Sequence, residues 1–234
     1  MSQLTVGCDQ PGADGNQLII SYLLLRRIVG WIGTLLPIVL LVGGVISSQA
    51  RPDSMSGYYY TDMRNVFVGA LCALGAFLGA YDGYDWVDRW ITNAAGFCAV
   101  GVAFCPTKPT VAHLSNAQQV VGDFHVFFAV TTFTMLGLMA LRFANDGETP
   151  QYRGAIVIYR ATGITILTCV LVAVLSNLLP PSVNANWPVL FIVEAIAVFA
   201  FGVSWFVKGQ TMERLLGRQV TTRPPLTPMI WPVT

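Results

Sequence analysis

The sequence predicts an all-α fold, a polytopic six-helix transmembrane bundle with its N- and C-termini in the cytoplasm. Three observations predict it: 54% of the 234 residues are hydrophobic and 11% are charged, six apolar runs approach or exceed the length of a membrane span, and basic residues favour alternate loops. Soluble domains carry about 25% charged residues, so a polar surface could not cover these apolar side chains. The composition therefore indicates an integral membrane protein.

The six predicted spans follow one another closely along the chain. A helix needs about 20 apolar residues to cross the hydrocarbon layer. The spans are residues 28–46, 66–81, 91–105, 120–141, 155–179 and 187–207. The third is short unless Trp86 to Trp90 extend its helix.

Two flanking segments complete the predicted organisation. Residues 17–27 either form an interfacial helix or lengthen the first span. After residue 208 a short basic helix, TMERLLGRQ, is expected to end at the prolines of RPPLTPMIWP. The chain is therefore divided into a cytoplasmic tail with an interfacial helix (1–27), a membrane domain (28–208) and a second cytoplasmic tail (209–234).

The distribution of Lys and Arg orients the bundle. With a cytoplasmic N-terminus, the outer loops hold three basic residues, Arg51, Arg64 and Lys108. The cytoplasmic side then holds ten: Arg26, Arg27, Arg89, Arg142, Arg153, Arg160, Lys208, Arg214, Arg218 and Arg223. This bias follows the positive-inside rule and predicts cytoplasmic termini. Within the spans, GAFLG at residues 75–79 is expected to allow close internal helix packing.

The segment SGYYYTDMRN, residues 56–65, lies at the predicted outer surface just before the second span. Its tyrosines suit an aromatic belt at the headgroup layer. In an extended segment Tyr58 and Tyr60 would share a side while Tyr59 turns away. Arg64 would pair with a carboxylate such as Asp62 or hold a phosphate. A weak surface ion pair is the alternative interpretation.

The two histidines, His113 and His125, also fall on the predicted outer side. Asp123 and His125 are two residues apart, so on a helix they point in nearly opposite directions and cannot form one site by themselves. One is expected to face the bundle and the other the loop.

Glu194 is the clearest ionisable residue inside a predicted span, roughly 10 Å below its outer end. Such residues usually face the bundle and have a partner. Arg64 or His125 is the expected partner, and a protonated, hydrogen-bonded carboxyl is the alternative. On the inner side Asp82, Asp85 and Asp88 would share a helical face, where a solvated acidic turn is favoured over a divalent-cation site.

The third and fourth spans resemble a known type of membrane protein. AGFCAVGVAFCPTKPT, followed by a loop and HVFFAVTTF, is similar to bacterial six-helix membrane proteins of unknown function, and through them to the DRAM/FRAG/SFK family. The resemblance covers residues 28 to 143. His125 matches the histidine near the start of the fourth span, with His113 as the second choice. The resemblance implies a six-helix fold and a link to lipid handling, and it transfers no catalytic residue.

Several classes of site are excluded by missing residues. The only lysines, Lys108 and Lys208, are not central in a span, which excludes retinal. No P-loop is present, which excludes a nucleotide site of that type, and a net charge of +1 gives no indication of nucleic-acid binding. The five cysteines do not form a disulfide framework or a metal-ligand motif.

The function predicted from these residues is binding or processing of a lipid, or another membrane-associated ligand, in a polar pocket on the outer side. Whether the protein is an enzyme is left open. Candidate catalytic residues are His125, Asp123 and Asp62. Candidate ligand-binding residues are Tyr58, Tyr60, Asp62, Arg64, His113 and Glu194. The predicted cofactor is a divalent metal, with His113 and His125 as its candidate ligands.

Two other functions are carried as alternatives: a small-solute or ion transporter or channel with Glu194 and Arg160 along its path, and an accessory subunit of a larger membrane complex. The expected partners are membrane lipids and either further copies of the chain or a larger membrane complex. The expected location is a bacterial plasma membrane.

Overall fold

The computed structural model describes residues 11–47, 51–81, 83, 85–109, 113–145, 153–176 and 188–222, and within these ranges it describes side chains between residues 24 and 210. This part of the chain is all-helical, which confirms the predicted class. Its elements are α1 (Pro11–Ile46), the 3-10 helix η1 (Ser56–Tyr60), α2 (Arg64–Gly79), α3 (Trp86–Phe104), α4 (Asn116–Phe143), α5 (Arg153–Ser176) and α7 (Val189–Thr222).

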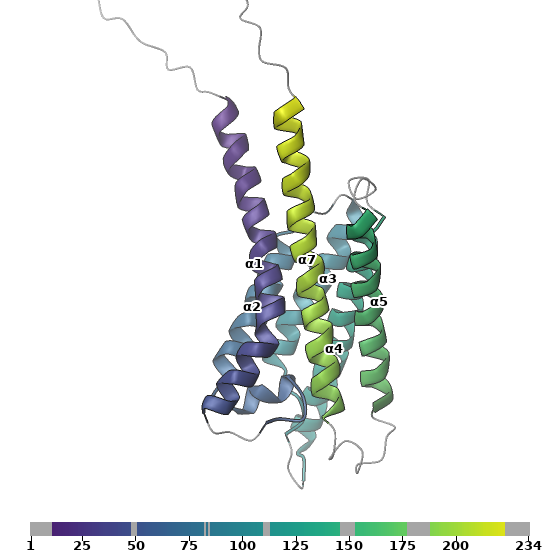
Figure 1. Ribbon diagram of the computed structural model, residues 1–234. Helices are drawn as coiled ribbons and strands as arrows, with labels where there is room; N and C mark the ends of the chain where they lie inside the picture. Colours follow the sequence, from purple (N-terminus) through teal and green to yellow (C-terminus); the bar gives the residue numbers. More distant parts are fainter. Residues whose placement is uncertain are drawn as a thin grey trace, which may run out of the picture.

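The α-helices form a closed ring that follows the order of the chain (Figure 1). Each helix from α1 to α5 packs against the next, α5 packs against α7, and α7 packs along α1. A smaller contact joins α4 to α7. The core therefore lies on the axis of the ring, where every helix contributes its buried face.

Four helical segments are long and apolar enough to cross a membrane: Leu24–Ile46, Asn116–Phe143, Arg153–Ser176 and Val189–Gln210. By length and composition this is an integral membrane protein. α2 is apolar but has only 16 residues. α3 has 19 residues, and its first turns carry polar side chains such as Asp88 and Arg89. A bundle with six spans therefore stays a prediction.

The first and last helices are longer than the sequence predicted. α1 is continuous from Pro11, so residues 17–27 lengthen the first helix and do not form a separate interfacial one. α7 continues to Thr222, so the predicted basic helix of the tail is joined to the last span. The proline-rich end of that tail lies outside the described residues.

Figure 1 shows that α1 begins and α7 ends at the same end of the bundle, where both project beyond the other helices. We call this the terminal end, and the opposite end, where η1 lies, the distal end. The sequence predicts a cytoplasmic terminal end and an outer distal end. The placement of the two ends relative to a membrane stays a prediction.

Small residues bring neighbouring helices into close contact. A Cβ atom on Gly202 of α7 would lie 2.5 Å from the backbone nitrogen of Thr34 in α1, so the α1–α7 crossing requires glycine there. Between α2 and α3, a Cβ on Gly75 would lie 2.8 Å from the carbonyl oxygen of Gly96. This confirms the internal packing role predicted for GAFLG.

Capping residues set the helix starts. Asp85 precedes α3 and its side chain accepts a hydrogen bond from the backbone N–H of Asp88 at 2.8 Å. Trp86 to Trp90 do extend the third helix, as its shortness suggested. Ser115 and Gln118 form a capping box before α4, so this helix begins four residues ahead of the predicted span at 120.

Candidate functional site

The distal end is covered by residues 51–63, which we call the distal cap. Hydrogen bonds fasten it to other parts of the bundle. The backbone N–H of Met55 donates to Glu194 Oε2 at 2.6 Å, and the N–H of Phe191 donates to the carbonyl of Asp53 at 3.0 Å. The Tyr60 hydroxyl donates to the carbonyl of Thr107 at 2.6 Å. The cap is therefore fixed to α7 and to the segment after α3.

A groove of about 600 Å³, the vestibule, lies on the distal surface. Its charged lining residues are Arg51, Asp53 and Lys108. Lys108 Nζ lies 2.6 Å from Asp123 Oδ1, and the Arg51 guanidinium lies 5.8 Å from the centre of the Phe191 ring. The remaining lining residues are Pro52, Ser54, Gly57, Tyr60, Thr61, Thr107, Pro109 and Leu190.

Beside the vestibule is a second cavity of about 110 Å³ between α4 and α5, with α7 behind it; we call it the slot. Its apolar walls are Val126, Ala129, Val130 and Phe133 of α4, Val170, Ala173 and Val174 of α5, and Leu190 of α7. Val126 and Val174 are 50% and 46% exposed, so the slot reaches the lipid-facing surface of the ring. Its polar end is formed by Ser54, Ser56, Thr107, His125 and Glu194.

A third cavity of about 50 Å³ lies inside the ring, and we call it the internal cavity. It shares Ser56, Ala129, Phe133 and Glu194 with the slot, and its far part is aliphatic. Thr132 lines it, and the hydroxyl group of this residue is buried and has no hydrogen-bond partner. The slot in turn shares Ser54, Thr107 and Leu190 with the vestibule. The three spaces therefore adjoin one another, and Glu194 stands between the two inner ones.

Glu194 has a partner, but not the one expected from the sequence. Its carboxylate accepts hydrogen bonds from the N–H of Met55 and from Ser56 of the distal cap. The prediction of Arg64 or His125 as partner is wrong, because Arg64 donates to the Tyr59 hydroxyl and His125 lies against the carbonyl of Cys105. Backbone N–H groups exposed at the start of η1 take the place of a cation.

His125 and Asp123 separate as the helical spacing predicted. His125 is only 3% exposed and lines the slot, whereas Asp123 is exposed and pairs with Lys108. The Nδ1 atom of His125 lies 2.5 Å from the carbonyl oxygen of Cys105, the C-cap residue that follows α3. A carbonyl only accepts, so Nδ1 carries the proton, and in the neutral ring only Nε2 can accept. His113 is exposed and lines none of the three cavities.

The three tyrosines are not extended but form the 3-10 helix η1, which corrects the predicted alternation. Tyr58 is 1% exposed and packs near the Phe191 ring, whereas Tyr60 is 49% exposed and pairs with Tyr59. Tyr58 and Tyr60 therefore do not share a face. Burial raises the pKa of Tyr58 above its usual value, and nearby Arg51 lowers it in part.

The charged residues that follow η1 lie on the surface. The Arg64 guanidinium stacks on the Tyr59 ring, 4.2 Å from its centre, and donates to its hydroxyl at 2.5 Å. Asp62 is exposed. Neither residue lines the vestibule, the slot or the internal cavity.

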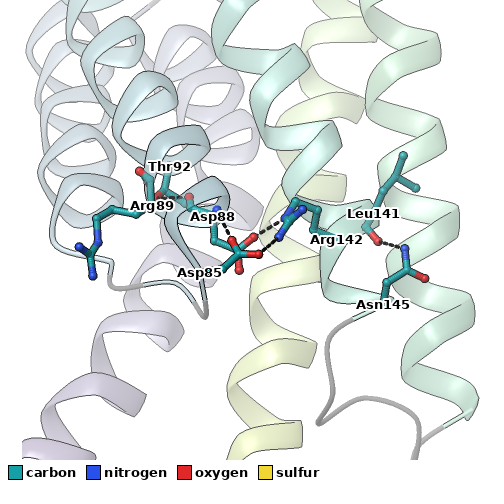
Figure 2. A network of polar contacts seen from close by, with 7 residues as sticks. All are labelled: Asp85, Asp88, Arg89, Thr92, Leu141, Arg142 and Asn145. Atoms are coloured by element: carbon teal, nitrogen blue, oxygen red, sulfur yellow. Dashed lines mark hydrogen bonds and ion pairs between the residues drawn. The ribbon is translucent and has the colours of Figure 1, made fainter.

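At the terminal end, Arg142 of α4 holds two carboxylates of the segment that begins α3 (Figure 2). Its Nη2 lies 2.7 Å from Asp85 Oδ2, and its Nε donates to Asp88. Asp85 precedes the helix in an extended conformation, so it does not share a helical face with Asp88 as predicted. Asp82 lies outside the described residues. The aspartates meet a guanidinium that sequence spacing did not reveal.

Aromatic rings and two buried cations close the terminal end of the core. The rings of Tyr81, Phe143 and Trp205 pack edge to face with centres 5.0–6.5 Å apart. Lys208 Nζ lies 5.2 Å from the centre of the Phe143 ring, and the Arg26 guanidinium lies 5.3 Å from that of Tyr81. Both cations are fully buried, and such contacts stabilise a cation away from water.

The described side chains include neither a cluster of metal-ligand residues nor a disulfide. No group of three or more His, Cys, Asp or Glu residues is placed to hold a metal within this part of the chain. Cys72, Cys98, Cys105 and Cys169 are free thiols, and Cys8 lies outside the described residues. The metal predicted at His113 and His125 is left untested.

Ser54, Ser56 and Thr107 line the polar end of the slot, and the sequence alone did not predict their role. Ser54 and Ser56 are buried although they stand in a loop of ordinary polar composition. The segment that contains them is fastened by a hydrogen bond between Met55 and Glu194, which are 139 residues apart in the sequence. The only local indication was the intramembrane position of Glu194 itself.

No protein-family model, curated protein or solved structure matches the chain. The resemblance to bacterial six-helix proteins and the DRAM/FRAG/SFK family therefore stays a prediction.

Proposed function

We propose that this integral membrane protein binds a membrane amphiphile at the distal end, with the apolar chain of the ligand in the slot and its polar group beside Glu194 and the distal cap. The observation that carries the proposal is the slot itself. Its aliphatic walls open between α4 and α5 at the lipid-facing surface and lead to buried polar side chains. A ligand site is typically such an apolar cavity with a few convergent polar groups.

The adjoining vestibule supports the same function. Arg51 and Lys108 line a polar groove that shares Ser54 and Thr107 with the slot. An amphiphile in the bilayer needs both surroundings, because its chain loses contact with water in the slot while its polar parts keep hydrogen-bond partners. Membrane lipids are thus the proposed partners, and a bacterial plasma membrane is the proposed location.

Binding is proposed in preference to transport. A transport path would have to continue from Glu194 to the terminal end, where the rings of Tyr81, Phe143 and Trp205 fill the core. Arg160, the other residue expected on such a path, is exposed on α5. Catalysis is not part of the proposal, because Asp62 and Asp123 are exposed and lie outside the slot.

Native mass spectrometry of the full chain, extracted gently from membranes, tests this function. The wild-type protein is expected to retain a lipid. Ala173→Trp, which fills the α5 wall of the slot, is expected to lose it. Ala161→Trp is the matched control, because Ala161 is an exposed residue of the same helix outside the slot.

A wild-type protein that retains no lipid, or an Ala173→Trp variant that retains the same lipid as wild type, would overturn the proposal. The unfolding temperature of each variant in detergent separates a blocked slot from a damaged fold. Ala173→Trp is informative when its unfolding temperature stays near that of Ala161→Trp.

A further inference from the structure

The polar end of the slot differs from the vestibule in the sign of its charged groups. Among the described residues, the slot is lined by no Lys or Arg, and its one acidic group is the Glu194 carboxyl. The cations Arg51 and Lys108 line the vestibule instead. A ligand group that reaches the end of the slot therefore meets the Glu194 carboxyl, the hydroxyl groups of the serines and the His125 ring, and no Lys or Arg side chain.

Glu194 keeps acceptor capacity after its contacts with the distal cap are counted. A carboxylate offers about four lone-pair sites on its two oxygens. The donors that reach it are the N–H of Met55, the N–H of Ser56 and the Ser56 hydroxyl. At least one lone pair is left, and the remaining surface of Glu194 faces the slot and the internal cavity that it lines.

Ser54 supplies the complementary donor. This buried side chain lines the slot, and its oxygen accepts a hydrogen bond from the N–H of Gly57 at 3.0 Å. The hydroxyl hydrogen of Ser54 is not used in that bond. A group that both donates and accepts would therefore satisfy Glu194 and Ser54 together.

The buried hydroxyl of Thr132 is an independent indication that a polar occupant belongs in this region. Its Oγ1 atom has no hydrogen-bond partner, and Thr132 lines the internal cavity, which adjoins the slot at Glu194. An unsatisfied buried hydroxyl destabilises the fold, because its hydrogen bonds to water are lost and not replaced. A volume of about 50 Å³ accepts a water molecule or a small polar group beside it.

From these contacts we propose that the ligand of the slot is a neutral amphiphile with a free hydroxyl group, of the class of long-chain alcohols and acylglycerols, whose hydroxyl donates to Glu194 and accepts from Ser54. This inference rests on the proposed function and names its ligand class. A phosphate at this position would face a carboxyl group with no cation from the slot lining to neutralise it. An ammonium group would be desolvated in an apolar slot and would leave the Ser54 hydroxyl hydrogen without an acceptor.

Three probes with the same oleoyl chain test the ligand class on the delipidated full-length protein. They are monooleoylglycerol, oleoyl lysophosphatidic acid and oleylamine, titrated separately and followed by native mass spectrometry. Monooleoylglycerol is expected to bind at least about tenfold more tightly than either charged probe. Equal or tighter binding of a charged probe would overturn the ligand class and leave the proposed function in place. If none of the probes binds, both proposals fail.

Two variants test the residue assigned to the hydroxyl. Glu194→Gln keeps an oxygen that can accept from Met55 but removes the carboxylate, and it is expected to reduce the preference for monooleoylglycerol over lysophosphatidic acid at least about fivefold. Asp123→Asn is the control, because it removes an acidic group at the same end that lies outside the slot. An unchanged preference in Glu194→Gln would overturn the assignment.

Discussion

The two ends of the bundle bury carboxyl groups in different ways. At the terminal end the Asp88 carboxylate meets a side-chain cation, Arg142, and aromatic rings fill the adjacent core. At the distal end the Glu194 carboxyl meets the backbone N–H of Met55, and two cavities remain beside it. The Asp88 carboxylate is thus enclosed by its partner, whereas the Glu194 carboxyl still borders the slot and the internal cavity.

This difference has a physical consequence for what each end can do. A guanidinium paired with a carboxylate satisfies its charge and its hydrogen bonds at once, so such a contact stabilises without leaving a place for a ligand. Backbone N–H groups satisfy only part of a carboxyl, and the cavities cost packing energy. We infer that the terminal end supplies stability and that the distal end gives up some of it for binding.

The largest expected loss of stability follows from removing Arg142, which pairs with Asp85 and Asp88 at the terminal end. Arg142→Ala would leave the buried Asp88 carboxylate without its guanidinium partner. Removing one member of a buried pair costs about 3–5 kcal/mol, and because the Arg142 side chain is 37% exposed we expect about 2–4 kcal/mol here. Equilibrium unfolding in mixed detergent micelles measures this loss.

Arg142→Ala is also expected to leave lipid retention unchanged under conditions where the variant is folded. Arg153→Ala is the matched control, since Arg153 is an exposed basic residue in the first turn of α5. A loss of stability equal in both variants would show that the contacts of Arg142 with Asp85 and Asp88 contribute nothing specific.

A change at Glu194, at the distal end, is expected to reduce stability less than Arg142→Ala does and to reduce lipid binding more. Glu194→Ala leaves the N–H of Met55 without an acceptor, which costs about 1–3 kcal/mol. The same change removes the acceptor proposed for the ligand, so retained lipid should fall several-fold in native mass spectra. Stability lost without any change in retained lipid would limit Glu194 to fastening the distal cap.

Two Thr→Val changes, one near each end, are expected to change the free energy of unfolding by about 1 kcal/mol or less, in opposite directions. The buried Thr132 hydroxyl has no partner, so Thr132→Val should raise the stability of the lipid-free protein by about 0.5–1 kcal/mol. The buried Thr92 hydroxyl near the terminal end donates to the carbonyl of Asp88 at 2.9 Å, so Thr92→Val should lower stability by about as much. Destabilisation by Thr132→Val would instead indicate that water in the internal cavity satisfies the hydroxyl.

Patterns along the chain predicted the helices well because apolar length and helix breakers are local properties. They also predicted that one residue of the pair Asp123 and His125 faces the bundle while the other meets the loop, since this follows from helical spacing alone. The structure shows that His125 is the buried one and Asp123 the exposed one. The partners of Glu194 and Asp88 were missed because each contact joins distant segments, and one of them uses backbone N–H groups that every residue possesses. The tyrosine segment was predicted as extended, whereas it forms the 3-10 helix η1, which is held by backbone hydrogen bonds within the distal cap.

The smallest expected effect concerns the exposed member of the terminal network. The N–H of Asp88 donates to the Asp85 side chain, and this bond, assisted by the charge of Arg142, lowers the pKa of Asp85 in the folded protein. An aspartate whose folded-state pKa is lowered stabilises the fold above its unfolded value of about 4, and this contribution is lost as the pH falls through the folded-state pKa.

Asp85→Asn tests this contribution because asparagine can still cap α3 but carries no charge to titrate. The unfolding temperature of the wild type should fall more steeply below about pH 4 than that of Asp85→Asn, and the two curves should differ by a constant amount at higher pH. Asp123→Asn is the distal control, because Asp123 and its partner Lys108 are both exposed and such surface pairs contribute little to stability. The stability of this variant is therefore expected to change with pH as that of the wild type does. The opposite result would be an unfolding temperature of Asp85→Asn that falls with pH as the wild type's does, while that of Asp123→Asn does not. The acid-sensitive contact would then lie at the distal end and not at the terminal end.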